Sequence, residues 1–192
     1  MKASHILAAA VSAVTLAATN AVAQPYVIAA AGGNFDERHV IPVAGSTDAD
    51  ALKGSLCTGE DWVVFSGTSQ KNGKIVSICM MEGDDEMPSH LTYRFGTPGN
   101  VEMIWPKRAK GSARQFTLRV YTRPRTTYVK FEFETDGFEY AILEGSDGNE
   151  TDASLRVTRL SDDKVVAEHP LTLLNSELMM LDGLVRTAPF DE

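Results

Sequence analysis

Apolar and polar side chains alternate along residues 116–160 of the chain. Alternation of this kind is typical of β-strands with one buried and one solvated face. Asp136 and Gly137 interrupt the pattern, and this dipeptide favours the positive φ angles of a two-residue hairpin turn. The stretch is therefore predicted to form four successive antiparallel strands. Their apolar faces would carry Phe116, Leu118 and Val120, then Val129, Phe131 and Phe133, then Phe138, Tyr140 and Ile142.

Shorter stretches on both sides extend this pattern. Asn72-Gly73 predicts a further hairpin. Residues 175–184 are expected to form a short helix, which Asn175 or Ser176 caps and Gly183 ends. About ten short strands in one domain predict an all-β fold, an antiparallel β-sandwich or flattened barrel with a short C-terminal helix. The additional strands are expected at residues 26–31, 39–43, 61–66, 75–79, 91–95, 101–105 and 164–167.

The N-terminal segment has a different composition. Lys2 precedes an apolar run, and Ala21-Val22-Ala23 has the small-x-small pattern of a cleavage site. These features predict a secretory signal peptide over residues 1–23, with residues 24–192 forming a single β-domain. No later apolar run is long enough to cross a bilayer. The mature protein is therefore expected in the periplasm or secreted, without membrane insertion.

Two cysteines, Cys57 and Cys79, lie in the predicted domain. In an oxidising compartment an even pair is most simply joined as one disulfide. A metal site or a redox pair is the alternative, but the chain has no C-x-x-C motif and no histidine close to either cysteine. We therefore expect a structural disulfide, with no bound metal and no cofactor.

The charge of the chain is acidic, with a formal net value of −8. Loss of the signal peptide removes Lys2 and leaves 17 basic residues against 26 acidic ones, a net charge of −9. That excess disfavours nucleic acid and anionic membranes as partners and favours attraction to a basic protein. Solubility alone is the simpler reason for it. The sequence is also compatible with a homodimer.

Motifs for catalysis are absent from the sequence. The predicted domain offers only His39, His90 and His169 as imidazole bases. It has no G-x-S-x-G elbow, no H-E-x-x-H motif and no phosphate-binding glycine loop. We therefore expect a protein that is not an enzyme.

One candidate binding stretch is residues 119–128, where positive charge gathers in an acidic chain. Arginine and tyrosine are the residues that most often anchor protein interfaces. The alternative is that the arginines pair with Glu132, Glu134 and Glu139 on neighbouring strands. The stretch contains Arg119, Tyr121, Arg123, Arg125 and Tyr128.

A second candidate is the polar loop at residues 144–153, which includes Gly145, Ser146, Asp147 and Gly148. Small polar residues suit a loop that projects into a partner, and binding residues concentrate on such loops. A solvated loop is the plain alternative. Calcium held by Asp147, Asn149 and Asp152 is another, although the spacing departs from the EF-hand pattern. The acidic loop at residues 82–88 is expected to be a solvated hairpin tip rather than a calcium site.

Several motifs resemble a known family. The segments VVFSGTSQKNGKIVSIC, LTYRFGTPGNVEMIWP, YTRPRTTYVKFEF and GFEYAILEGSDG are similar to exported bacterial proteins that include the periplasmic inhibitors of invertebrate-type (i-type) lysozyme. The resemblance covers roughly residues 57–166. It implies a β-sandwich that blocks a lysozyme by inserting a loop into the catalytic cleft. In the family that loop carries a Ser-Gly-x-Tyr type pattern, whereas here Ser146 is followed by Asp147 and Gly148.

The resemblance leads to a first hypothesis, in which residues 146–148 enter the cleft of a lysozyme or another basic protein and residues 123–128 support them. In the competing hypothesis, a cell-envelope module uses Arg123, Arg125 and Tyr128 to bind peptidoglycan fragments or an acidic glycan.

Overall fold

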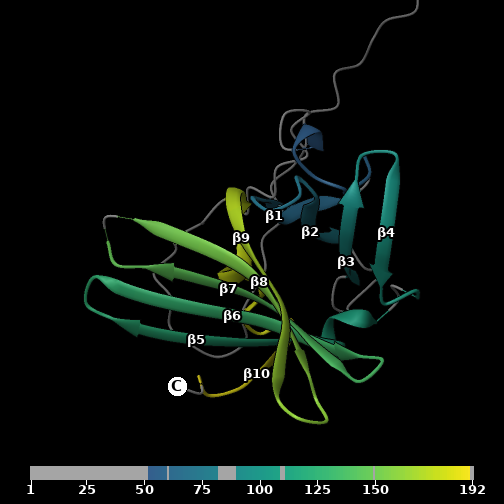
Figure 1. Ribbon diagram of the computed structural model, residues 1–192. Coiled ribbons are helices and arrows are strands. Elements are labelled where there is room, and N and C mark those ends of the chain that lie inside the picture. Colours follow the sequence, from purple (N-terminus) through teal and green to yellow (C-terminus); the bar gives the residue numbers. More distant parts are fainter. Residues whose placement is uncertain (1–51, 60, 82–89, 109–110, 149, 191–192) are drawn as a thin grey trace, which may run out of the picture. The chain divides into compact units, whose positions relative to one another are not determined.

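A computed structural model describes residues 52–59, 61–81, 90–108, 111–148 and 150–190 (Figure 1). The predicted signal peptide, the strands expected at residues 26–31 and 39–43 and the acidic loop at 82–88 lie outside these ranges. The chain divides into two units, and the described residues all belong to the second, residues 45–192.

The described part of the chain is almost entirely β-structure. Strands account for 62% of it, and it contains no helix of seven or more residues. Two short 3₁₀ turns occur, η1 (Ser112–Gln115) and η2 (Leu178–Leu181). The strands are β1 (Trp62–Ser69), β2 (Ile75–Met81), β3 (His90–Thr97), β4 (Asn100–Trp105), β5 (Thr117–Arg123), β6 (Thr126–Thr135), β7 (Phe138–Ser146), β8 (Thr151–Arg159), β9 (Lys164–Ser176) and β10 (Arg186–Thr187).

All ten strands join one sheet, in the order β10-β5-β6-β7-β8-β9-β1-β2-β3-β4. The pairings are antiparallel except that of the two-residue β10 with β5. The sheet is curled into a half-barrel, which is visible where β5–β9 sweep across Figure 1. The all-β prediction is therefore confirmed. The predicted β-sandwich is not confirmed, because the strands are hydrogen-bonded into one continuous sheet.

The predicted meander is confirmed as β5–β8. Asp136 and Gly137 form the β6–β7 turn with φ angles of 51° and 80°, the left-handed values that made this dipeptide informative. The Asn72-Gly73 turn likewise joins β1 to β2, with Gly73 at φ 69°.

The predicted C-terminal helix is wrong. Asn175 and Ser176, expected to cap it, are instead the last residues of β9 and pair with Ser66 and Phe65 of β1. The first part of the predicted helix therefore belongs to strand β9, and only the 3₁₀ turn η2 follows it. Leu178 and Leu181 in η2 are 1% and 0% exposed, so they close the core. The last long strand also runs nine residues beyond the predicted end at residue 167, to Ser176.

An aromatic cluster holds the curl of the sheet. The Trp105 ring on β4 stacks on Phe133 of β6, with centroids 4.2 Å apart and planes at 14°. Phe133 also stacks on Tyr140 of β7 at 5.1 Å and lies 5.0 Å from the ring of Tyr93 on β3. The contacts of Phe133 with Trp105 and Tyr93 join β6 to β4 and β3, which are far apart in the sheet order, so they close the concave face around the core.

The segment before β1 is fixed by two long-range links. Cys57 and Cys79 form the predicted disulfide, with Cα atoms 5.5 Å apart. Arg94 of β3 pairs with the buried Asp61 at 2.8 Å and donates a hydrogen bond to the Leu56 carbonyl at 2.8 Å. Both links tie this segment, through Leu56, Cys57 and Asp61, to the β2–β3 part of the sheet.

Truncation of Phe133 tests the aromatic cluster. Phe133→Ala is expected to reduce the free energy of unfolding by about 3–5 kcal/mol, because it leaves a cavity among the rings of Tyr93, Trp105, Phe116 and Tyr140. Urea denaturation followed by tryptophan fluorescence would measure the change. The control is Phe138→Ala, which removes a half-buried ring from the neighbouring strand and is expected to cost clearly less. Equal losses in the two variants would contradict a special role for Phe133.

Candidate functional site

The two binding stretches predicted from sequence lie side by side. Residues 124–125 form the β5–β6 turn, and the β7–β8 loop begins at residue 147. Because β6 pairs with β7, Tyr128 lies opposite Gly145 and Thr127 opposite Ser146. A Cβ atom built on Gly148 would lie 3.3 Å from the Arg125 carbonyl oxygen, so the two hairpin ends touch. We call this the hairpin-tip surface, comprising Arg123, Arg125, Tyr128, Gly145, Ser146, Asp147 and Gly148.

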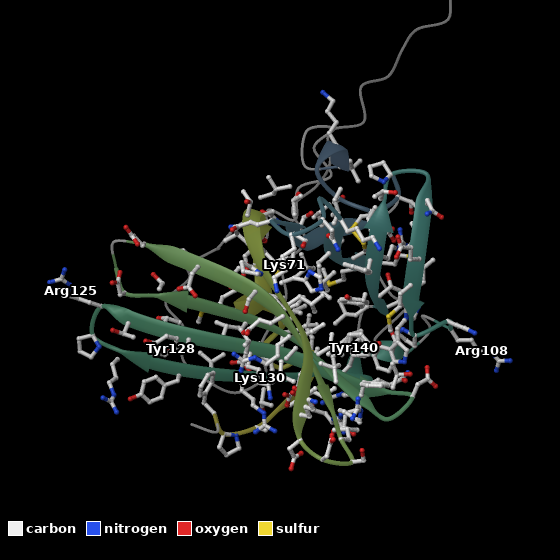
Figure 2. The ribbon with its side chains drawn as sticks, viewed as in Figure 1. Lys71, Arg108, Arg125, Tyr128, Lys130 and Tyr140 are labelled. Atoms are coloured by element: carbon white, nitrogen blue, oxygen red, sulfur yellow. A yellow bond between two sulfur atoms is a disulfide. The ribbon has the colours of Figure 1, made fainter. Side chains whose placement is uncertain are left out.

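The arginines of the first stretch have two different roles. Arg119 pairs with Glu132 at 2.7 Å and donates to the Pro189 carbonyl at 2.6 Å, as in the cross-strand alternative. Burial would raise the pKa of Glu132, but hydrogen bonds from Lys130 and Arg119 outweigh it and lower that pKa. Arg123 and Arg125 are exposed and form no ion pair with any described residue. Arg125 points away from the sheet at the hairpin end in Figure 2.

A second group of aromatic rings, separate from those around Phe133, flanks Arg123 and Arg125. The rings of Tyr121, Tyr128 and Phe190 lie 6.2–6.3 Å from one another. The guanidinium carbon of Arg123 lies 4.8 Å from the centroid of Tyr121, within cation–π distance. Tyr128 is 44% exposed, so part of this cluster is available to a partner.

Glycine and aspartate shape the β7–β8 loop. A Cβ atom on Gly145 would lie 2.8 Å from Asp152 Oδ1 and 3.3 Å from Tyr128 Cε1, so a larger residue would have to displace the Asp152 carboxylate and shift Tyr128. Gly148 adopts φ +87°, which disfavours other residues. Asp147 Oδ1 accepts a hydrogen bond from the Glu150 N–H at 3.1 Å. Asp147, predicted to contact a partner, thus also closes its own loop.

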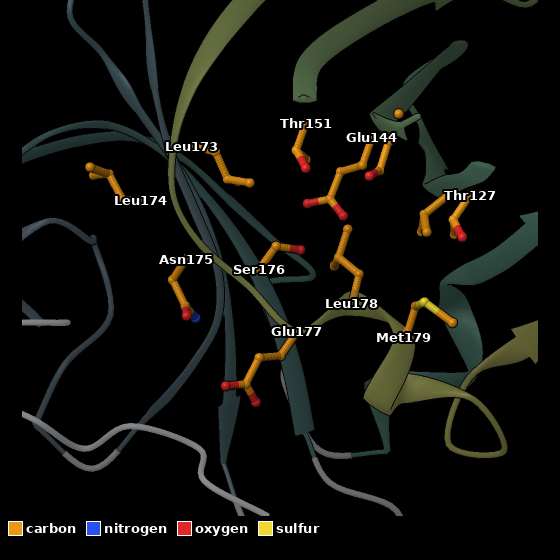
Figure 3. Close-up of a pocket in the computed structure, with 13 residues that line it drawn as sticks. Thr127, Glu144, Thr151, Leu173, Leu174, Asn175, Ser176, Glu177, Leu178 and Met179 are labelled. Carbon is orange, nitrogen blue, oxygen red and sulfur yellow. The ribbon is translucent and has the colours of Figure 1, made fainter. Parts of the chain in front are cut away.

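A groove of about 550 Å³ opens beside this surface (Figure 3). It lies between the loop ends of β6–β8, the end of β9 and η2, and it shares Gly145 and Ser146 with the hairpin-tip surface. No lysine, arginine or histidine is among the described residues that line it. These residues are Thr127, Val129, Glu144, Gly145, Ser146, Thr151, Leu173, Leu174, Asn175, Ser176, Glu177, Leu178 and Met179.

Glu144 is the carboxylate directed into the groove. Figure 3 shows its carboxyl group among Thr151, Ser176 and Leu178, whereas Glu177 points away. Its Oε1 atom is shielded from solvent and has no hydrogen-bond partner among the described residues. Burial raises the pKa of Glu144 above the ordinary value of 4.5, and a hydrogen bond with Ser176 opposes that shift only in part.

The prediction from sequence placed Glu144 at the start of a polar loop at residues 144–153 and not among the site residues. The structure corrects these bounds, because β7 continues to Ser146 and β8 begins at Thr151. The pattern nevertheless contained a signal for Glu144. Phe138, Tyr140, Ile142 and Glu144 follow one another at every second position of β7 and therefore lie on one face of the strand. A single acid on an otherwise apolar strand face is unusual, since burial of an unpaired charge is costly.

A second cavity, of about 360 Å³, lies among β3, β4, β7, β8 and β9 and includes His169 in its lining. His169 Nδ1 lies 3.1 Å from the hydroxyl of Ser69, although the two residues are 100 positions apart in sequence. Burial lowers the pKa of His169, and Lys71 and Lys74 lower it further. Within the described ranges no carboxylate bonds to the ring, and Ser69 is only 1% exposed. The pair therefore lacks the orienting third group and the accessible nucleophile of a hydrolase.

The part of the chain that the structure describes has neither a metal-binding cluster nor a membrane-spanning helix. That part contains no cluster of three or more His, Cys, Asp or Glu side chains able to hold a metal ion. Its helical turns include none with the length and apolar character needed to span a bilayer.

Comparisons with known proteins gave no match: no family model, no curated protein and no solved structure is significantly similar to this chain. The resemblance to lysozyme inhibitors therefore stays a prediction from the motifs, and the function must be argued from the site itself.

Replacement of Glu144 tests its burial. An acid whose pKa is higher in the folded than in the unfolded state binds its proton more tightly when folded. Its favourable contribution to folding stability is therefore complete at low pH and is lost as the pH rises through the raised pKa. The melting temperature of Glu144→Gln relative to the unsubstituted protein is therefore expected to increase as the pH rises above about 4.5. Thermal melts between pH 4 and pH 8, as a rough range for a carboxyl group, would measure it.

Glu134→Gln is the control, because Glu134 is exposed on the adjacent strand β6. The account of a buried Glu144 would be contradicted if the melting-temperature difference between Glu144→Gln and the unsubstituted protein did not change with pH. It would also be contradicted if that difference changed as it does for Glu134→Gln.

Proposed function

We propose that this protein is an exported, non-enzymatic binding domain that inhibits a lysozyme, with the i-type class as the favoured target. The loop at residues 146–148 would enter the catalytic cleft, and the β5–β6 turn would support it from the side. The observation that carries the proposal is the contact between Gly148 and Arg125, which unites the two predicted binding stretches at one end of the sheet.

The composition of the hairpin-tip surface supports a protein partner. Exposed arginines beside a half-exposed tyrosine cluster are the side chains that most often anchor interfaces. The loop beside them is short, polar and closed on itself by the Asp147–Glu150 hydrogen bond, so little chain entropy would be lost on binding.

Charge supports a basic partner. The whole chain carries a formal net charge of −8, which would accelerate encounter with a cationic protein. Export is supported by the Cys57–Cys79 disulfide, a bond that persists in oxidising compartments, and by the signal peptide predicted at residues 1–23. We therefore place the proposed activity in the periplasm or outside the cell.

The test is residual activity of i-type, c-type and g-type lysozymes on cell-wall substrate while the purified protein is titrated in. Loss of activity at a one-to-one ratio is expected for the i-type enzyme. Ser146→Arg is expected to weaken inhibition by about tenfold or more, because it adds bulk and positive charge at the loop facing a basic partner.

Ser161→Arg is the matched control. Ser161 is exposed in the β8–β9 turn, which lies beside the β6–β7 turn at the opposite end of the strands. This variant is expected to inhibit like the unsubstituted protein. Absence of inhibition with all three lysozyme classes at micromolar protein would refute the proposal. Equal effects of Ser146→Arg and Ser161→Arg would show that the loop at residues 146–148 does not enter the cleft.

A second function is favoured by one specific observation. Arg123 stacked on Tyr121, with Tyr128 and Phe190 beside it, offers the cation and the aromatic faces that an acidic sugar requires. The protein would then be a cell-envelope module that binds peptidoglycan fragments or an acidic glycan.

The combined variant Arg123→Ala, Arg125→Ala separates the two functions. Glycan binding, measured by calorimetry with soluble peptidoglycan fragments, is expected to fall about tenfold or more, because the charged donors are lost. Inhibition of a basic lysozyme is expected to survive with only a modest loss, because the loop at residues 146–148 is still present to enter the cleft. Unchanged glycan binding in this variant, or no binding by the unsubstituted protein, would exclude the second function.

A further inference from the structure

The groove beside the hairpin-tip surface has the features of a receptor for one cationic side chain. Glu144 brings a carboxyl group into it, and the Oε1 atom of that group has no hydrogen-bond partner among the described residues. A buried, incompletely bonded carboxyl group favours any ligand that brings hydrogen-bond donors and positive charge.

The remaining lining specifies the shape of that ligand. Val129, Leu173 and Leu178 provide apolar wall, and Met179, 53% exposed, extends it to the rim. The hydroxyl groups of Thr127, Thr151 and Ser176 add hydrogen-bond acceptors within the same groove. Apolar walls around a polar end suit an unbranched apolar stem with a charged head, which is the build of lysine.

The charge of the lining disfavours an anionic ligand. The described lining includes the Glu144 carboxyl group and no basic residue, so an anionic group would find no cation there. The volume of about 550 Å³ exceeds one side chain and leaves room for the backbone segment that bears it. The groove also shares Gly145 and Ser146 with the hairpin-tip surface, so a partner seated on that surface would reach it.

We propose that the groove is the receptor for a single lysine side chain of the bound partner, with the ammonium group at the Glu144 carboxylate and the methylene stem against Leu173 and Leu178. The inference rests on the proposed role of the hairpin-tip surface in binding a basic protein, and it names the group by which that protein is recognised. Lysine fits better than arginine, since its compact ammonium group can donate to one carboxylate oxygen and two hydroxyl groups at once.

The experiment uses a capped glycine peptide with one central lysine and a second peptide with norleucine in its place, which keeps the stem and removes the amine. Each is titrated into the full protein while backbone amide shifts are recorded by NMR. The lysine peptide is expected to shift the amides of Glu144, Ser146 and Ser176, and the norleucine peptide is expected to bind about thirtyfold or more weakly, the loss typical of an unpaired buried charge.

Glu144→Gln is expected to weaken binding of the lysine peptide by a similar factor, whereas the exposed Glu134→Gln is expected to leave it unchanged. Equal binding of the two peptides, no effect of Glu144→Gln, or shifts confined to other residues would overturn the inference.

The lysozyme assay separates this inference from the proposed function. If the lysine peptide binds through Glu144 and no lysozyme is inhibited, the receptor stands and the lysozyme proposal fails. If a lysozyme is inhibited equally by the unsubstituted protein and by Glu144→Gln, and the peptide does not bind, the lysine receptor is wrong and the inhibitor proposal stands.

Discussion

Stacking of Phe133 between Trp105 and Tyr140 is the interaction on which the rest of the structure depends. A sheet of ten strands would expose its apolar face if it stayed open. The contact between β4 and β6 closes the curl, and Tyr93 packs against the same ring from β3. Once the curl is fixed, the loop ends of β6–β8 and the end of β9 border the groove, and Glu144 faces into it. The same curled sheet thus encloses the core and borders the groove.

Local patterns in the sequence predicted the strands well and their assembly poorly. Alternation at Phe131, Phe133, Tyr140 and Ile142 and the Asp136-Gly137 turn depend on neighbouring residues, so β6 and β7 could be predicted without the fold. The C-terminal helix was mispredicted because Asn175 and Ser176 have cap-like chemistry, while pairing with β1 decides their conformation. The curl depends on contacts between β4 and β6, which no local pattern contains.

The site shows the same division between local and long-range information. Arg123, Arg125 and residues 145–148 were found from composition, but as two separate stretches whose distance in the fold was unknown. The β6–β7 register makes them neighbours, and Gly148 lies against Arg125. The groove could not be predicted, because it needs residues from β6, β7, β8, β9 and η2 together. Glu144 could have been identified from the sequence, since it continues the apolar face of β7.

Hydrogen–deuterium exchange of the protein with and without i-type lysozyme tests the central claim most directly, namely that the two hairpin ends act as one binding surface. Slower exchange is expected in both the 123–128 and the 145–152 segments when the lysozyme is added. The turn at residues 160–163, at the other end of the strands, is expected to exchange as before. Protection of only one hairpin end, protection at the opposite end, or no protection at all would contradict it.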